Sequence, residues 1–251
     1  MRLVAFFFFL VFSLCFFKPP LRSDSAHLNE IHRMAVLYLI PQDHPIKDAL
    51  DDLFSRSRVT ENENALLGAG FEIIAKTPMS FIVVSKHCAF PGYIFKIYLD
   101  SETRTRKGIP HWKQLLSRCI GAQKIRKLIQ EKQLCYFDVP DKWLYPLPEY
   151  PISREKNPQP FILIETDMEI ENADVTKLCW KSVRQEHLDE LFEIFKRGYG
   201  SVSLIQNVPY TKNGKFAFID TEYPRRVLDL RKVKKFLPAD MQRYWDSLIG
   251  G

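Results

Sequence analysis

Three short apolar segments between Phe71 and Asp100 constrain the fold more than any other part of the chain. They are rich in Ile, Val, Phe and Tyr, and a proline-containing turn separates each from the next. Short β-branched and aromatic runs with such turns between them are typical of consecutive antiparallel strands. We therefore predict a three-stranded antiparallel meander, with strands at Phe71–Ala75, Ser80–Ser85 and Tyr93–Leu99.

The remainder of the chain is predicted to be mainly helical, with few further strands. A long helix is expected from Pro110 to about Gln133, because apolar residues recur there at helical spacing, and Gly121 is a candidate bend. The other expected elements are a helix at Pro45–Phe54, a polar loop at Ser55–Asn64, a proline-rich irregular connector at Val139–Pro160, a strand at Phe161–Glu165, a helix between a Ser182/Gln185 capping box and Gly198, a hairpin at Asn213-Gly214 with its second strand at Lys215–Ile219, and a helix after Pro238.

Residues 1–26 are expected to direct export. A positively charged start precedes an unbroken apolar run at residues 3–17, which proline residues end. This is the pattern of a secretory signal, and the run is short for a membrane span, which needs about twenty apolar residues. Ala26 is the best cleavage position, but Asp24 stands where a small residue is preferred, so a cleaved signal peptide and an uncleaved anchor both stay open. In either case residues 27–251 form the folded part of an exported protein.

Charge and cysteine content narrow the function only slightly. The net charge is +6, and without Arg2, Lys18, Arg22 and Asp24 of residues 1–26 it is +4, which is too mild to indicate specific nucleic-acid binding. The four cysteines after residue 26 form no Cys-x-x-Cys pair, which disfavours zinc and leaves two disulfides or four buried thiols open. A basic run near the C-terminus is either a solvated helix face or a surface for an anionic membrane or phosphorylated partner: Arg225, Arg226, Arg231, Lys232, Lys234 and Lys235.

Three polar residues carry the functional argument. Lys96 lies in the third predicted strand, Asn207 precedes the Asn-Gly turn, and Asp220 ends the strand after that turn, thirteen residues beyond Asn207. In this order and spacing, the segment from about Phe71 to Glu222 resembles the protein-kinase-like superfamily. The resemblance implies an α+β, two-lobed fold with a small antiparallel N-lobe sheet (about 45–160) and a shortened helical C-lobe (about 161–251).

The same resemblance implies a site for ATP and Mg²⁺. By position, Lys96 matches the third-strand lysine that neutralises the α- and β-phosphates, and Asn207 and Asp220 match the metal ligands. The strand and hinge where adenine docks correspond to Phe161–Met168, which places Glu165 and Asp167 at the cofactor. Alternatively, the acidic residues that begin with these two are a metal site of their own or a solvated loop; the remaining members are Glu169 and Glu171.

Several departures from the superfamily pattern bear on activity. Val202 stands five residues before Asn207, where a kinase carries its catalytic aspartate, and valine cannot accept a proton. The glycine-rich phosphate cover is missing, and Glu131 is the only helix glutamate available to Lys96. The sequence therefore favours a pseudokinase that binds nucleotide or Mg²⁺ without efficient phosphoryl transfer, with no catalytic residue assigned.

Two alternatives stay open beside the pseudokinase. One is an active, atypical phosphotransferase in which Asp220 or Glu222 takes over part of the work of the missing base. The other is an exported domain that binds a protein partner and has no nucleotide site. Taken singly, each site residue also has a plain structural explanation: Lys96 as a solvent-facing strand residue, Asn207 as part of a turn and Asp220 as a cap.

Overall fold

The computed structural model describes residues 30–31, 33–77, 80–222 and 227–250. The chain divides into two compact units, residues 1–36 and residues 37–251. In the first unit the described residues are mostly helical, and the signal segment predicted at residues 1–26 lies outside them. Within the described part of the chain, no helix combines the length and apolar character needed to cross a membrane.

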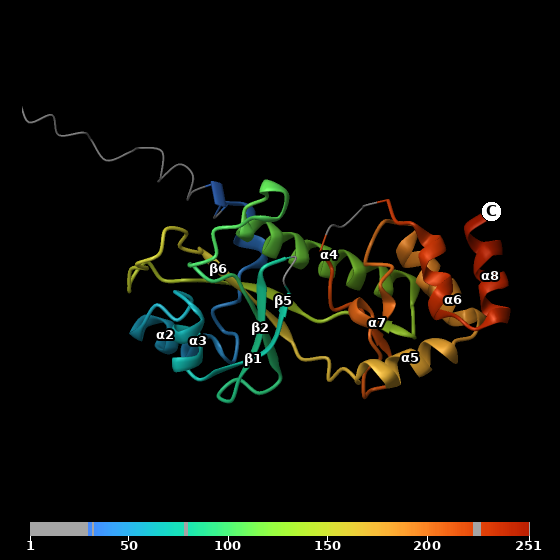
Figure 1. Cartoon of the computed structure of the whole chain (residues 1–251), viewed down its shortest axis with the longest axis horizontal. Helices are drawn as coiled ribbons and strands as arrows, with labels where there is room; N and C mark the ends of the chain where they lie inside the picture. Colours follow the sequence, from blue (N-terminus) through green and yellow to red (C-terminus); the bar gives the residue numbers. More distant parts are fainter. Residues whose placement is uncertain (1–29, 32, 78–79, 223–226, 251) are drawn as a thin grey trace, which may run out of the picture. The chain divides into compact units, whose positions relative to one another are not determined.

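The second unit is α+β and contains an antiparallel five-stranded sheet (Figure 1). The predicted meander is confirmed as its first three strands, with an irregular register between Ile73 and Ala75. The sheet continues from β3 to β6 and then to β5 at the edge. Its strands are β1 (Phe71–Thr77), β2 (Ile82–His87), β3 (Tyr93–Ile97), β5 (Lys142–Pro146) and β6 (Phe161–Thr166).

The edge strand β5 corrects one prediction, because it lies in the segment expected to be an irregular connector. Leu144 and Tyr145 are buried, and Pro146 ends the strand. Proline is tolerated at the end of an edge strand, since it removes only one donor from the ladder. The proline content that suggested a loop is therefore compatible with pairing along β6.

Two short helices, α2 (Lys47–Arg56) and α3 (Glu63–Gly68), pack on one face of the sheet. Their buried side chains, among them Phe54 and Leu66, contact inward-facing strand residues such as Phe95. Helix α2 confirms a predicted helix. The expected loop at Ser55–Asn64 is too long by two residues at each end, because α2 continues to Arg56 and α3, which was not predicted, begins at Glu63.

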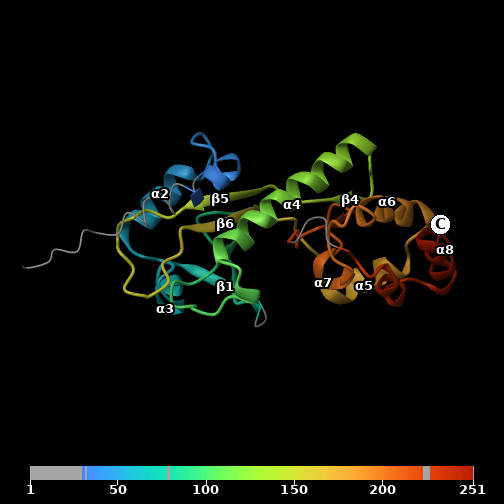
Figure 2. The ribbon, with the colours of Figure 1, turned by 90° about the horizontal axis from the view of Figure 1, so that it is seen from above.

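The long helix α4 (His111–Lys132) was predicted and covers the opposite face of the sheet, where it contacts β5 and β6. Its second half enters the C-terminal hydrophobic core through residues such as Ile125 and Leu128. Figure 2 shows this helix passing from the sheet toward the C-terminal helices. Gly121 lies within one continuous helix. A Cβ atom at Gly121 would lie 2.0 Å from the carbonyl oxygen of Thr221, so this glycine permits close packing.

The C-terminal core is formed by helices around a short parallel pair of strands. Its large buried aromatic residues are Phe137, Trp180, Phe195, Phe216, Phe218 and Trp245. Its elements are β4 (Phe137–Asp138), α5 (Ala173–Lys181), α6 (Gln185–Phe195), α7 (Leu204–Asn207), β7 (Phe216–Ala217) and α8 (Ala239–Gly250). The short 3₁₀ helices among the described residues are η1 (Val36–Tyr38), η2 (Arg106–Gly108) and η3 (Leu230–Phe236).

Two local predictions in this half were wrong. Ser182 does not cap α6: it ends α5, and its hydroxyl donates to the carbonyl of Leu178. At the Asn213-Gly214 turn only Gly214 has a positive φ, +85°, whereas both residues were expected to. The hairpin is a single bridge between Tyr210 and Phe216, because Phe216 pairs mainly with β4.

Candidate functional site

Lys96 lies on the buried face of β3. Its neighbours Phe95 and Ile97 point toward α2 and α3, so alternation along the strand turns Lys96 to the face that α4 covers. Only 8% of Lys96 is exposed, which rules out the solvent-facing interpretation.

Two lysines share one carboxylate at this place. Glu165 on β6 is paired across the sheet with Lys142 on β5. The Nζ atom of Lys96 lies 2.8 Å from Oε1 of Glu165, and the Nζ atom of Lys142 lies 2.9 Å from Oε2. Both ammonium groups also donate to the carbonyl oxygen of Ile219, at 2.9 and 2.8 Å. The sheet is thus connected to the residue directly before Asp220.

Beyond Ile219, the chain meets the helix α4. The Nη2 atom of Arg118 lies 3.0 Å from Oε2 of Glu222, and its Nε atom lies 3.7 Å from Oδ1 of Asp220. Arg106 contacts the same Oε2 of Glu222 at 3.2 Å. The hydroxyl of Thr221 donates to the backbone carbonyl of Arg118 at 2.6 Å. Side chain and backbone contacts therefore fix this segment to α4.

These residues form one connected group of charges, which we call the charged cluster. It contains four cations and three carboxylates, so its formal net charge is +1. Asp220 is the most accessible carboxylate, with 36% of its side chain exposed, whereas those of Glu165 and Glu222 are almost fully buried. The members of the cluster are Lys96, Arg106, Arg118, Lys142, Glu165, Asp220 and Glu222.

Burial and neighbouring charges act in opposite directions on the pKa values of the cluster. Burial raises the pKa of Glu165, but Lys142 and Lys96 outweigh it and hold that pKa below its usual value. The same holds for Asp220, where Arg118 is the strongest opposing charge. Burial lowers the pKa of Lys142 to about 8, although Glu165 acts in the opposite direction.

Asn207 adjoins the cluster through its backbone. Its carbonyl oxygen accepts the N–H of Ile219 at 3.1 Å, which places α7 beside the segment that leads to Asp220. Its side-chain amide donates to the hydroxyl of Ser201 at 2.8 Å. Val202, which the sequence resemblance aligned with a catalytic base, packs against the C-terminal hydrophobic core.

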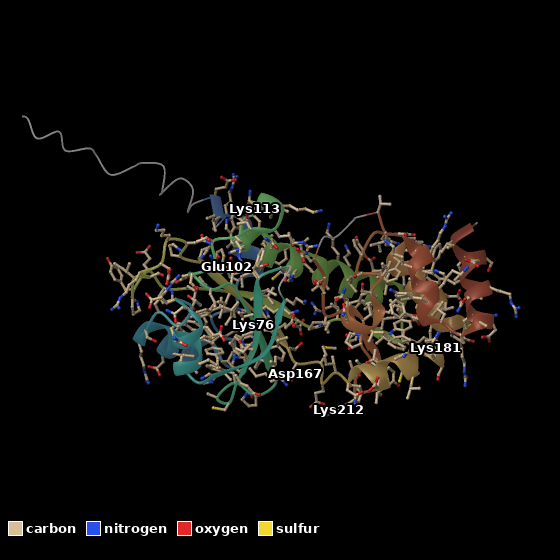
Figure 3. All side chains as sticks on the ribbon, viewed as in Figure 1. Lys76, Glu102, Lys113, Asp167, Lys181 and Lys212 are labelled. Atoms are coloured by element: carbon tan, nitrogen blue, oxygen red, sulfur yellow. The ribbon has the colours of Figure 1, made fainter. Side chains whose placement is uncertain are left out.

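Asp167 is held by other residues. Its carboxylate pairs with Lys86 at 2.7 Å and accepts the N–H of Glu169, and its own N–H donates to the carbonyl of Gly92. In Figure 3 Asp167 is labelled where the chain leaves β6 toward α5. Glu131 pairs with Lys127 on the exposed side of α4. No contact of the described residues joins either carboxylate to Lys96.

The structure adds three cations that the sequence interpretation missed, Arg106, Arg118 and Lys142. Arg118 follows Leu115 by three residues and precedes Ala122 by four, so it stands on the buried stripe of the predicted helix. A charged residue on an apolar stripe was a usable signal. Lys142 could not be found in this way, because the segment around it was predicted to be irregular.

Two pockets lie along α4, and the smaller of them includes Lys142 of the charged cluster. One, of about 160 Å³, is lined in part by Cys119, Lys142 and Trp143. The other, of about 620 Å³, lies between α4 and the residues after α6, and it includes Lys124 and Arg197. The cysteines Cys88, Cys119, Cys135 and Cys179 are all free thiols, and Cys119 alone among them is buried.

The basic C-terminal run is partly described. Arg225 and Arg226 lie outside the described residues. The other members belong to η3, where Lys232 pairs with Asp229 at 3.5 Å and Lys234 with Asp246 at 2.6 Å.

Comparisons with known proteins add no evidence to these observations. A scan against protein-family models found no family that matches the chain, and a search of curated proteins found no similar sequence.

Proposed function

We propose that this chain is a pseudokinase: a two-lobed, kinase-like domain that binds a nucleotide at the charged cluster and does not transfer its phosphate efficiently. The observation that carries the proposal is the contact between Lys96 and the carbonyl of Ile219. In kinases, the third-strand lysine and the metal-binding aspartate meet at the phosphates of ATP. Here Lys96 contacts the carbonyl of Ile219, which lies 123 residues further along the chain and directly before Asp220.

The excess positive charge of the cluster supports a phosphate ligand. An ammonium group has three N–H donors. Lys96 contacts three acceptor atoms, the two carboxylate oxygens of Glu165 and the carbonyl oxygen of Ile219, whereas Lys142 contacts two, Oε2 of Glu165 and the same carbonyl. The support for a phosphate is therefore the net positive charge of the cluster and not an unused donor of Lys96. Hydrogen bonds between cations and phosphate oxygens are among the strong ones in proteins.

The same region argues against phosphoryl transfer. A catalytic base must reach the proton of the attacking hydroxyl, and Val202 has no group that can accept it. Its packing against the hydrophobic core gives the residue a structural use instead. The anion beside Lys96 is Glu165 of the sheet, whereas a kinase uses a helix glutamate, and α4 presents Arg118 here. The charges around Lys96 therefore differ from those of a kinase, although the lysine itself is present.

Thermal unfolding of the full chain with and without ATP tests the proposal. Binding at a hundredfold excess over the dissociation constant stabilises a protein by about 2.7 kcal/mol, which is a shift of several degrees. Lys96→Met is expected to lose this shift. Lys212→Met, at an exposed lysine labelled in Figure 3, is the matched control and should retain it.

A transfer assay with radiolabelled ATP and a generic protein substrate completes the test. We expect nucleotide binding without labelled product. Efficient transfer would instead favour the atypical phosphotransferase. The absence of any shift at millimolar ATP, with Lys96→Met equal to the wild type, would refute nucleotide binding and favour a partner-binding domain.

A further inference from the structure

The kinase resemblance implies a magnesium ion at Asn207 and Asp220, and the residues present do not fit one. A magnesium site needs oxygen ligands in near-octahedral geometry. The carboxylate of Asp220 faces the guanidinium of Arg118, and among the described residues no group of three or more His, Cys, Asp or Glu side chains could hold a metal ion. Asn207 could add only its side-chain oxygen, because its amide nitrogen donates to Ser201. Glu222, the next carboxylate, already binds Arg118 and Arg106.

We infer that the guanidinium of Arg118 takes the place of the metal ion, so that this site receives the phosphates of a nucleotide in metal-free form. The nucleotide part of this inference rests on the proposed function. The exchange of a metal for an arginine is chemically reasonable, because both supply positive charge between phosphate oxygens and protein carboxylates.

Arg118 is built into the site rather than lying on its surface. Only 4% of the residue is exposed, and its position on α4 is fixed by the hydrogen bond from Thr221 and by the close approach at Gly121. A guanidinium remains charged at every physiological pH. Moving it aside for a divalent ion would leave a buried charge without its partner, which is costly.

Charge balance leads to the same conclusion. A divalent ion beside Asp220 would raise the formal charge of the cluster from one to three, with two guanidinium groups and two ammonium groups nearby. A triphosphate without a metal would instead offset the existing excess. The site therefore selects an anion, and it repels a free metal ion.

The variant Asp220→Asn separates the two models by the sign of its effect. Where Asp220 is a metal ligand, this variant weakens nucleotide binding in magnesium. Where Arg118 replaces the metal, removal of the carboxylate takes a negative charge away from the phosphates, and ATP should bind about tenfold more tightly. The gain should be equal in excess magnesium and in EDTA, measured by calorimetry on the full chain.

A titration of the wild type with Mn²⁺ alone tests the metal part without nucleotide. Electron paramagnetic resonance should detect no bound Mn²⁺ at millimolar concentration, whereas Arg118→Gln should bind it at least about tenfold more tightly. Bound Mn²⁺ on the wild type that Asp220→Asn abolishes would overturn the inference, as would ATP binding that needs magnesium.

The ATP and Mn²⁺ titrations distinguish the proposal of nucleotide binding from the inference that Arg118 replaces the metal. If ATP binds neither the wild type nor Asp220→Asn, nucleotide binding is wrong, and the Mn²⁺ titration of the wild type alone decides whether Arg118 excludes the metal. If Arg118→Gln does not fold, the wild type and Asp220→Asn still give the decision.

Discussion

Replacing Glu165 with glutamine should destabilise the protein strongly, because this carboxylate compensates two buried cations. The side chains of Lys96, Lys142 and Glu165 are 11%, 0% and 5% exposed, so water cannot substitute for the lost charge. Glutamine has nearly the same size and can still accept one hydrogen bond. The change therefore isolates the electrostatic contribution from packing.

Removing one partner of a buried ion pair typically costs 3–5 kcal/mol. Because both lysines keep the carbonyl of Ile219 as an acceptor, we expect about 3 kcal/mol for Glu165→Gln. This is a large share of the 5–15 kcal/mol by which domains are usually stable. The double variant Glu165→Gln/Lys142→Met should recover part of the loss, since it leaves one unpaired cation fewer.

Urea unfolding followed by circular dichroism measures these free energies, provided that the slope with urea is unchanged. Glu131→Gln is the matched control: its pair with Lys127 is exposed on α4, and it should cost less than about 0.5 kcal/mol. A loss below about 1 kcal/mol for Glu165→Gln, or no recovery in the double variant, would refute the view that Glu165 holds the two lysines in place.

Two further predictions follow from the packing and the charges. Gly121→Ala should lower the free energy of unfolding by about 1–3 kcal/mol, because the new methyl group would collide with the carbonyl of Thr221. Gly68→Ala, which has open space around it, is the control and should be neutral. Equal urea midpoints for the two variants would contradict this prediction. Lys142 has a folded-state pKa of about 8 against 10.5 ordinarily, so between these pH values the unfolded chain holds the proton that the folded chain has released. The stability of the wild type relative to Lys142→Met should therefore rise with pH from about 8 to 10 in urea unfolding, and a constant difference would contradict it.

Local sequence signals predicted the parts of the fold that have strong periodicity. The meander and α4 follow from apolar repeats that no other structure would bury equally well. The strand β5 did not follow, because prolines flank it and its pairing with β6 is a contact between distant segments. The capping box at Ser182 failed because α5 ends there, which the sequence around Ser182 does not reveal.

The candidate site was predictable only in outline. Lys96, Asn207 and Asp220 were identified by order and spacing, and their segments meet through backbone contacts with Ile219. Of the partners of these residues, Arg118 could have been noticed as a charge on the apolar stripe of α4, whereas Lys142 could not, since it lies on an unpredicted strand. Charge compensation in a buried cluster depends on tertiary contacts, which no local pattern encodes.

Isothermal titration calorimetry of ATP into the full chain tests the central claim most directly. The account predicts binding by the wild type, loss of binding in Lys96→Met, and retention in Lys212→Met, with no heat from hydrolysis. Equal binding, or equal absence of binding, in the wild type and Lys96→Met would show that the charged cluster is not a nucleotide site.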